Sequence, residues 1–531
     1  MGQTDAFSTA IFLKMLSFFF LPKAMKLKQF ILPLFLILLT FQNVFAQLTS
    51  NEIKEESLKE LRTSLKTFRE YLSIPNNGKV DEDIQANLEW CKDALESRGF
   101  KTKELMSGFV PHLFAKGTID PKKKTILVYM QIDGQPVDSS SWNQESPYIP
   151  ALKMKEGEEW EEINWNFLEG PIDPEWKIFA RSASDSKGPS MAFFTALDIL
   201  KKTGNQPSVN LKFILDFQEE MSSPELADVV AQNKELFEAD GILIMDGTRH
   251  ISNLPNLTFG ARGIATATIR VFGASKDLHS GQYGNFAPNP VFSLSKLLAA
   301  MKDEEGRVLI PDFYAGIQFS EEEINSMNKV PEDLEEIESE LGFAEAEKVG
   351  NSLQEALQFP SLNVRGLRAG WVGNEVRTLI PSEAVAEIDM RLVKETPGQR
   401  QIDLLKQFVI DQGFHLVEDE PTIEERNSYP KLASFEYRLG SDPFRAEMDS
   451  PFANWLKSGM NYVFGDQYIN TRTTGGSQPM APFINILGVP AVSVRIPNPD
   501  NSIHAPNENI RIGNYLEGIQ TCLGILTQPF Q

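Results

Sequence analysis

The sequence predicts an α/β protein with a mainly parallel central sheet and a separate, inserted α+β unit. Three short apolar runs, each followed by polar residues, predict strands at 125–130, 211–217 and 241–245. Helical patterns alternate with these runs at 189–201 and 224–237. Apolar strands that alternate with helices are typical of a parallel sheet covered on both faces.

The remaining elements divide the chain into two domains. Acid-rich amphipathic segments predict helices near 51–72 and 82–98. From Ile264 the pattern changes, and the expected elements are a strand at 266–271, a helix at 291–301, a Glu-rich stretch at 320–349, a strand at 384–392 and a helix at 399–412. We therefore expect 47–261 and 466–531 to form one domain, with 262–465 inserted as a second.

Residues 1–46 are predicted to be an export signal. Basic Lys26 and Lys28 precede an apolar run at 30–40. A cleavage site marked by a small residue follows, with Ala46 as the last residue before the cut. This signal is complete from Met25, which makes Met25 a candidate for the true start. The apolar run falls short of the roughly 20 residues that span a bilayer. We expect cleavage, an exported periplasmic or secreted protein, and no stable membrane span afterwards.

Charge and cysteine content exclude several classes of protein. The chain has 51 Lys and Arg against 73 Asp and Glu, a net charge of −22. Nucleic-acid binders need a basic surface, so no nucleic-acid partner is expected. The two cysteines, Cys91 and Cys522, exclude a disulfide scaffold and a Cys-based zinc site. Export would permit a disulfide between them, and buried free thiols are the alternative.

Carboxylates stand where the predicted strands end. Asp133 follows the first strand and Asp246 the third, while Asp185 precedes a helix. Each alone is also typical of a helix cap or a turn. Glu219 and Glu220 directly follow an apolar strand, where like charges in a partly desolvated place repel each other. A divalent cation would relieve that repulsion.

The five histidines fall into two groups. His112 and His415 lie among apolar residues and are expected to be structural, and His250 follows a strand-end loop typical of a surface. His279 and His504 stand in polar loops before a helix, where ligand and structural roles are both open.

Together these segments resemble the aminoacylase/carnosinase/carboxypeptidase-G superfamily of di-zinc metallopeptidases and deacylases. The similarity runs from about residue 50 to 528 and is strongest to the carnosinase-like branch, through the sequences at 133–138, 173–176 and 504–509. It implies a zinc-peptidase-like catalytic domain with an inserted lid and dimerisation domain, and therefore a homodimer.

The resemblance also implies a role for each matching residue. Asp185 is similar to the carboxylate that bridges two metals, and the peptide bond after it is typically cis. Glu220 and His504 resemble the ligands that complete one metal site, and Asp246 resembles a ligand of the other. Glu219 matches the general base, and Asp133 the carboxylate that orients the ligand of the first motif.

Substrate contacts are implied mainly in the inserted domain. His279 corresponds to a histidine that reaches the partner subunit's site and stabilises the oxyanion. Thr378 and Arg391 match substrate-binding positions, where the guanidinium of Arg391 suits a free carboxylate. Gly476 and Ser477 resemble a backbone and a hydroxyl contact to substrate.

One residue departs from the family pattern. The first motif is His-x-Asp in the family, and here Gln131 stands in the histidine position. An amide oxygen is a poorer zinc donor than imidazole, so this ligand is expected to be weak or lost. One or two Zn²⁺ per subunit are expected, and Mn²⁺ or Mg²⁺ would suit the all-oxygen site of Gln131, Asp185 and Asp246.

Three functions follow from these residues. The leading interpretation is an exported metallopeptidase that cleaves small peptides, of dipeptidase or carboxypeptidase type, with metal-activated water and a Glu base. The second is a deacylase that acts on N-acyl amino acids with the same machinery. The third is a metal- or peptide-binding protein with weakened catalysis, which Gln131 favours and the intact Glu219, Glu220, His279 and His504 oppose.

Overall fold

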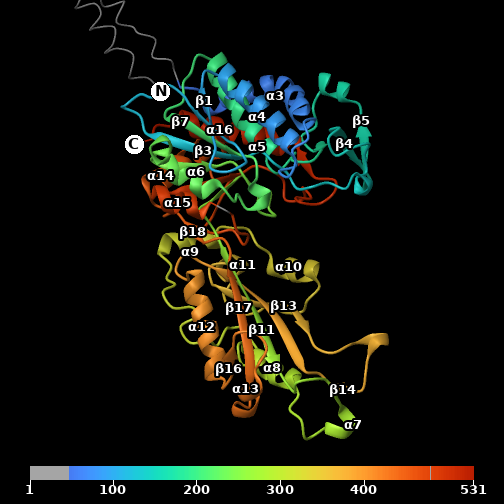
Figure 1. Cartoon of the computed structure of the whole chain (residues 1–531). Coiled ribbons are helices and arrows are strands. Elements are labelled where there is room, and N and C mark those ends of the chain that lie inside the picture. Colours follow the sequence, from blue (N-terminus) through green and yellow to red (C-terminus); the bar gives the residue numbers. More distant parts are fainter. Residues whose placement is uncertain (1–46, 479, 531) are drawn as a thin grey trace, which may run out of the picture. The chain divides into compact units, whose positions relative to one another are not determined.

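The computed structural model describes residues 47–478 and 480–530, and Figure 1 shows the chain coloured along its sequence. The predicted export signal at 1–46 lies outside the described residues. Among the helices that the structure describes, none is long and apolar enough to cross a membrane.

A large mixed sheet contains the three strands predicted for the first domain. In the described part of the chain, its order is β1-β2-β7-β3-β8-β20-β9-β19. The strands are β1 (Lys101–Leu105), β2 (His112–Lys116), β3 (Thr125–Gln131), β7 (Asn210–Asp216), β8 (Gly241–Ile244), β9 (Asn256–Thr258), β19 (Ile469–Thr471) and β20 (Ala491–Arg495). The neighbours β7, β3, β8 and β20 run parallel, whereas β2 runs antiparallel to β7 and β9 runs antiparallel to β20. The predicted parallel centre is confirmed, and it is flanked by antiparallel strands.

Both faces of this sheet are covered, because its central strands are apolar at nearly every position. In β3, Ile126, Val128 and Met130 belong to one buried cluster, whereas Leu127 and Tyr129 belong to another. The first cluster is completed by α3 (Ser50–Leu72), α4 (Asp81–Ser97), α5 (Lys187–Lys202), α14 (Pro451–Phe464) and α16 (Ile512–Thr527). The second is completed by α6 (Leu226–Gln232), η4 (Lys234–Phe237) and α15 (Ala481–Leu487). Figure 1 shows α3, α4 and α5 on one side of β3 and α6 and α15 on the other.

The helix predicted at 224–237 is broken in the structure. α6 ends at Gln232, and η4 begins at Lys234. Between them, Asn233 leaves helical geometry while its side-chain amide donates to the carbonyl oxygen of Val229 at 3.0 Å. Asparagine side chains compete with the backbone in this way, which ends the helix.

A smaller sheet joins segments from opposite ends of the chain. Its order among the described residues is β21-β6-β4-β5, formed by β4 (Ala151–Glu156), β5 (Glu159–Ile163), β6 (Lys177–Phe179) and β21 (Asn509–Arg511). Phe179 of β6 stands opposite Asn509 of β21. Because β6 leads into residues 181–185 and β21 follows residues 504–508, this pairing brings the two segments together.

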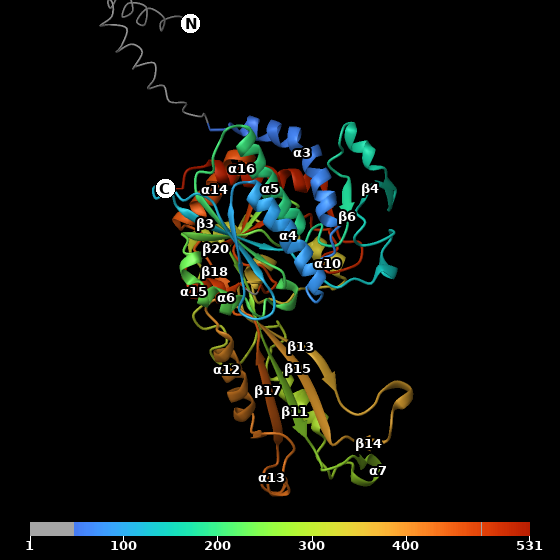
Figure 2. The same cartoon turned by 45° about the horizontal axis from the view of Figure 1, so that its top comes forward.

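The inserted region forms its own sheet, in the order β13-β15-β11-β17-β16 over the described residues. The strands are β11 (Gly263–Phe272), β13 (Ser361–Arg368), β15 (Glu383–Leu392), β16 (His415–Val417) and β17 (Leu432–Leu439). Figure 2 shows β13, β15, β11 and β17 side by side. Buried residues alternate with half-buried ones along β11 and β15. The buried face packs against α8 (Pro290–Ala299) and α12 (Gly398–Asp411), which leaves the other face available to a site.

Short elements complete the fold. They are η1 (Ser139–Ser141), η2 (Trp165–Glu169), η3 (Glu219–Met221), β10 (Gly260–Ala261) paired with β18 (Phe444–Arg445), β12 (Leu278–His279) paired with β14 (Leu379–Ile380), α7 (Ser280–Tyr283), α9 (Glu321–Asn328), α10 (Leu334–Leu341), α11 (Leu353–Ala356), η5 (Gly373–Glu375) and α13 (Ile423–Ser428).

The domain boundaries at 262 and 465 stay predictions. All strands of the five-stranded sheet lie between them, whereas α14 packs into the core of the large sheet.

The two cysteines are free and buried. Cys91 lies in α4, where its sulfur is 3.3 Å from the hydroxyl of Tyr71, and Cys522 lies in α16. Of the two alternatives for the cysteines, the structure therefore has free thiols.

Candidate active site

Loops from four parallel strands meet at one edge of the large sheet. β3 ends at Gln131 and leads to Asp133, β7 leads to Glu219 and Glu220, and β8 leads to Asp246. The loop after β20 carries His504. Ligand sites of α/β sheets form at the carboxyl ends of parallel strands, so the fold gathers most of the predicted site residues in one place.

Asp185, Glu220 and His504 form a group that can hold a metal ion. One ligand atom from each lies within 4.8 Å of the others. His504 Nε2 is 2.9 Å from Asp185 Oδ2 and 3.2 Å from Glu220 Oε2. Two carboxylates and one imidazole are donors that zinc accepts. The arrangement therefore fits a divalent cation held by these three residues.

The charges of this group are strongly perturbed. Burial raises the pKa of Asp185 to about 8. Hydrogen bonds to Asp185 and Glu220 raise the pKa of His504 to about 10. Clustered, buried carboxylates need a neutralising positive charge, which either a proton or a cation supplies. A cation at the three ligand atoms would replace the proton of His504.

Glu219 stands beside this group on the same turn, η3. Burial raises its pKa well above the ordinary value, and the negative charges of Asp246, Asp185 and Glu220 raise it further. A carboxylate with a raised pKa can accept a proton near neutral pH and release it again. The environment of Glu219 therefore suits the predicted general base.

Asp133 lies beneath the turn that carries the two glutamates. Its carboxylate accepts hydrogen bonds from the backbone N–H groups of Glu219, at 3.0 Å, and Glu220, at 3.2 Å. Burial, and then the charge of Asp216, raise the pKa of Asp133. A Cβ added at Gly78 would lie 2.8 Å from its Oδ2, so that glycine permits the close approach. Asp133 thus positions η3, and its predicted action on Gln131 stays a prediction.

Asp246 is held by hydrogen bonds on both carboxylate oxygens. Ser186 Oγ lies 3.0 Å from Asp185 Oδ1 and 2.9 Å from Asp246 Oδ1, so one hydroxyl connects both carboxylates. Gln478 Nε2 donates to Asp246 Oδ2 at 2.8 Å. Gln131 is buried at the end of β3, and its amide nitrogen has no hydrogen-bond partner among the described residues. Ser186 therefore connects Asp246 to Asp185, while the part of Gln131 in a second metal position stays a prediction.

Glu508 holds the loop that carries Asp185. It is fully buried, and its carboxylate accepts from the backbone N–H groups of Ser182, Ser184 and Asp185, each at 2.9 Å. Arg181 Nη1 and Ser184 Oγ donate to it at 2.7 Å. The Asp185–Ser186 peptide bond is cis, in agreement with the resemblance. Since His504 lies on the same loop as Glu508, one segment positions two of the three candidate ligands.

The predicted substrate contacts fall into two places. Arg391 Nη1 lies 3.2 Å from Ser477 Oγ, next to Gly476, and Gln478 of the same segment reaches Asp246. His279 ends β12, Thr378 directly precedes β14, with which β12 pairs, and both residues are exposed. His279 Nδ1 accepts from the backbone of Gly281 at 3.1 Å, which caps α7. Within the described chain, no hydrogen bond or ion pair joins His279 to the acidic cluster.

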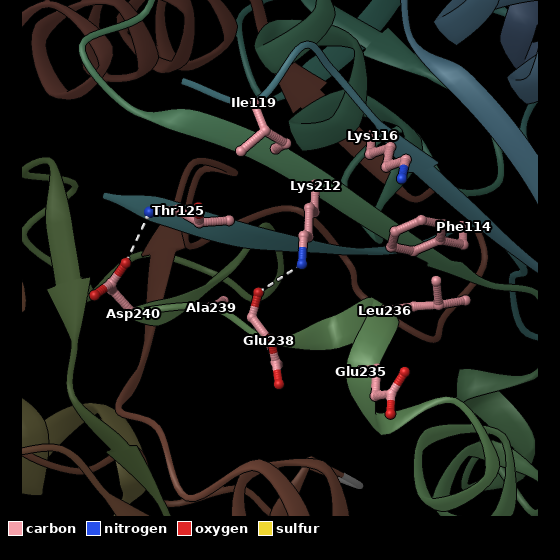
Figure 3. Close-up of a pocket in the computed structure, with 10 residues that line it drawn as sticks. All are labelled: Phe114, Lys116, Ile119, Thr125, Lys212, Glu235, Leu236, Glu238, Ala239 and Asp240. Carbon is pink, nitrogen blue, oxygen red and sulfur yellow. Dashed lines mark hydrogen bonds between the residues drawn. The ribbon is translucent and has the colours of Figure 1, made fainter. Parts of the chain in front are cut away.

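A cavity at the opposite edge of the large sheet is not part of this site. It has a volume of about 470 Å³ and lies near the amino ends of β3 and β8. Figure 3 shows its polar groups engaged with the protein itself: Lys212 Nζ donates to the carbonyl oxygen of Glu238, and the carboxylate of Asp240 accepts from the backbone of Thr125.

Three residues of the site were missed by reasoning from the sequence: Ser186, Gln478 and Glu508. Glu508 stands in the same motif as His504, so the motif could have pointed to it. Ser186 follows Asp185 directly, whereas Gln478 carries no local signal.

Comparison with known proteins identifies the family. The profile of Peptidase family M20/M25/M40 matches residues 154–528. This chain belongs to that family. The predicted superfamily is confirmed, and so is the prediction that the protein is an enzyme of the metallopeptidase and amidohydrolase class.

Relatives match over most of their length. Human Beta-Ala-His dipeptidase is 28% identical over 479 residues, which cover 86% of this chain and 87% of the relative. Cys-Gly metallodipeptidase DUG1 of Candida albicans is 26% identical over 77% of this chain and 79% of its own. The crystal structure of a M20 family metallo-carboxypeptidase from Sulfolobus solfataricus has a TM-score of 0.68 and 27% identity, covering 87% of this chain and 98% of that one.

Proposed function

We propose that this M20-family protein is an exported metallo-dipeptidase that hydrolyses small peptides. The observation that carries the proposal is the group Asp185, Glu220 and His504, with ligand atoms within 4.8 Å of one another, beside a glutamate of raised pKa, Glu219. The names of its relatives add β-Ala-His and Cys-Gly as the first substrates to test.

Asp185, Glu220 and His504 would hold the cation, for which Zn²⁺ is proposed because of the imidazole donor. Bound there, it would polarise the scissile carbonyl and lower the pKa of the attacking water. The second position, at Gln131, Asp185 and Asp246, offers oxygen donors and suits Mn²⁺ or Mg²⁺ better. We therefore propose one tightly held cation and a second, weaker position.

Proton transfer, positioning and substrate binding are assigned to other residues of the chain. Glu219 takes the proton of the attacking water and delivers it to the leaving amine. Asp133 fixes Glu219 through its backbone N–H. Arg391, near Ser477, is placed to bind a carboxylate of the substrate with its guanidinium fork.

We further propose a homodimer in which His279 serves the partner's site. Two features support it: His279 is exposed on β12, and β13 is an edge strand with exposed Val364 and Leu367. Edge strands with exposed apolar residues are natural places for strand pairing between chains. Export is proposed from the basic, apolar and small-residue segments at 26–46.

Purified protein lacking residues 1–46, loaded with Zn²⁺ or Mn²⁺, tests the proposal. β-Ala-His, Cys-Gly and an N-acetyl amino acid are offered separately, with His504→Ala as the control that loses the cation. Peptide hydrolysis by the wild-type protein and none by the control would support a dipeptidase. Hydrolysis of the acyl amino acid alone would establish a deacylase instead, and cation binding with no hydrolysis would favour a binding protein.

A further inference from the structure

Arg495 lies beside Asp246 at the carboxyl edge of the large sheet. In the parallel pair of β8 and β20, Ser493 stands opposite Ile244. Continuing this register by two residues brings Arg495 opposite Asp246, and residues two apart in a strand face the same side of the sheet. The register therefore places an arginine next to a carboxylate of the proposed second cation position.

Gly247 leaves the space that the guanidinium of Arg495 fills. A Cβ added at Gly247 would collide with Nη1 and Cζ of Arg495, and this glycine has a φ of +92°. Gly247 directly follows Asp246, so the guanidinium packs against the backbone of the loop that carries this carboxylate. Burial lowers the pKa of Arg495, and the negative charges of Asp246 and Asp185 oppose that lowering. The arginine is therefore close enough to the acidic cluster for the charges to act on each other.

The positive charge of Arg495 has no direct partner. The residue is 7% exposed. Its Nε donates to Thr258 Oγ1 at 3.3 Å, its Nη2 is buried without a hydrogen-bond partner, and it forms no ion pair within the described part of the chain. A buried cation is costly unless negative charge lies near it. The carboxylates of Asp246 and Asp185 supply that negative charge.

The surroundings of Asp246 fit a second metal ion poorly. Ser186 Oγ and Gln478 Nε2 lie 2.9 Å and 2.8 Å from its two carboxylate oxygens, so both oxygens already have donors from the protein. On the other side of β8, the register with β3 continued by two residues places Gln131 beside Asp246. The amide nitrogen of Gln131 is buried without a partner among the described residues. Asp246 is thus flanked by N–H donors, which repel a cation.

We propose that Arg495 supplies a fixed positive charge at Asp246 in the place of a second metal ion, so that each subunit binds one cation tightly, at Asp185, Glu220 and His504. This inference rests on the cation site of the proposed function and deepens it. A guanidinium keeps its charge and is not removed by a chelator, whereas a bound metal ion dissociates when its free concentration falls. The same charge repels a divalent ion at Asp246, which makes the second position weak.

The test counts cations and measures their affinities. Zn²⁺ and Mn²⁺ are titrated calorimetrically into purified, metal-free protein, and the metal per subunit is determined after gel filtration. Wild type should bind one Zn²⁺ tightly. Arg495→Gln should bind a second Mn²⁺ at least about 10-fold more tightly than wild type does, because a nearby unit charge no longer repels the divalent ion. Arg495→Lys keeps the charge and should bind like wild type.

Zinc is compared in a background that offers an imidazole to the second position. Gln131→His/Arg495→Gln should bind its second Zn²⁺ at least about 10-fold more tightly than Gln131→His does. Gln131→His/Arg495→Lys should match Gln131→His. An equal affinity in all three proteins would overturn the proposal. An equal gain in the Gln and the Lys variants would also overturn it, because a change of shape rather than of charge would then open the site.

Arg249→Gln is the matched control for the loss of a buried arginine. Arg249 is 3% exposed, and its Nε donates to the carbonyl oxygen of Arg495 at 3.3 Å. Its own charge is paired with Glu517. Arg249→Gln should leave the affinity for the second cation unchanged. A gain as large as that of Arg495→Gln would overturn the specific role of Arg495.

Thermal unfolding gives a second readout of the same charge. With a chelator present, the midpoint of Arg495→Gln should fall below that of wild type, because the acidic cluster loses its internal cation, and Mn²⁺ should restore it by binding to the folded state. A midpoint that falls and is not restored by Mn²⁺ overturns the proposal. Should Arg495→Gln fail to fold, Arg495→Met replaces it with the same expectations. If neither folds, the wild-type count decides: one tight cation supports the proposal, and two of equal affinity overturn it.

These measurements need no hydrolysis, which separates this inference from the proposed function. Wild-type protein that binds one cation in the expected way and cleaves no peptide contradicts the dipeptidase and supports the role of Arg495. Wild-type protein that cleaves peptides while it holds two cations of equal affinity supports the dipeptidase and overturns the role of Arg495.

Discussion

Glu508 accepts a hydrogen bond of 2.9 Å from the backbone N–H of Asp185, although 323 residues separate the two in the chain. The carboxylate receives donors from Arg181, Ser182 and Ser184 as well. Because Glu508 also follows His504 by four residues, the geometry of the candidate cation site depends on this one buried side chain.

Glu508→Gln should weaken both the fold and the cation site. The amide loses one acceptor oxygen, which leaves Arg181 without its charged partner, and breaking such a buried pair costs roughly 3 kcal/mol of unfolding free energy. The Zn²⁺ dissociation constant should rise by about 10- to 100-fold, as for other groups that orient metal ligands. Urea unfolding and competition with a zinc chelator measure the two effects. Glu169→Gln, which alters an exposed pair with Lys66, should change neither, and a normal zinc affinity in Glu508→Gln would refute the positioning role.

Glu219→Gln should remove hydrolysis while the cation remains bound. The substitution removes a proton acceptor and retains the shape, and loss of a general base lowers rates by about 10²- to 10⁴-fold. Rate and metal content per subunit are measured on the same preparation. Glu220→Gln is the contrasting variant, in which metal should be lost first. The assignment fails if Glu219→Gln loses its metal or keeps its full rate.

Gln131→His should raise the zinc content toward two per subunit. Neutral imidazole binds zinc more tightly than an amide oxygen, and Asp185 and Asp246 would be the other ligands of the proposed second position. Metal analysis of both forms, together with turnover, distinguishes the outcomes. A gain of metal without a gain of rate means that this protein works with one cation, whereas unchanged metal content contradicts the proposed second position.

Lys187 should contribute stability that increases as the pH rises above neutrality. Its ammonium is fully buried, donates to the carbonyl oxygens of Tyr71 and Ile74, and has a pKa lowered by burial to about 7. Between pH 7 and its ordinary value of 10.5, the unfolded chain binds this proton and the folded chain does not. Unfolding free energy should therefore gain about 1.4 kcal/mol per pH unit from this group.

Lys187→Met isolates that contribution. The difference in unfolding free energy between wild type and variant should change by about 2 kcal/mol between pH 7 and pH 9, less than two full steps of about 1.36 kcal/mol because the folded amine is half protonated near pH 7. Lys201→Met, at an exposed position of α5, should show a constant difference. A pH-independent difference for Lys187→Met would mean that the buried amine keeps its proton throughout.

Mixed dimers test the supply of His279 in trans. His279→Ala and Glu219→Gln subunits should each be inactive alone. After subunit exchange, a mixed dimer has one site with both intact groups, so about one quarter of wild-type activity is expected if half of the dimers are mixed. Exchange is verified by two affinity tags. Verified exchange without recovered activity would show that each subunit supplies its own histidine or needs none.

The sequence was informative where local pattern decides structure. β3, β7 and β8 were predictable because they are apolar on both faces, and the acidic cluster was predictable because parallel strands end at one edge. The flanking strands β1, β2, β9 and β19 were missed, since they have only three to five residues each, too few to show a period. The break at Asn233 was missed because a single side-chain hydrogen bond decides it.

The contacts between remote segments could not be predicted in the same way. Glu508 lies in the quoted motif at 504–509, yet its five donors come from residues 181–185. Gln478 looks ordinary in the sequence, and only the placement of Asp246 gives it a role. Motif matching identified the residues that resemble metal ligands. The residues that hold those ligands in place could be identified only from the contacts in the folded structure.

The pairing of β6 with β21 has a consequence for biosynthesis. Asp185 and Glu220 leave the ribosome long before His504 and Glu508. Domains fold as their segments emerge, so a nascent chain carries its acidic residues through the synthesis of the whole inserted region without the imidazole and the buried glutamate that complete the site. A premature stop shortly before His504 would leave those carboxylates without both, and activity is gained only after residues 504–508 have been translated.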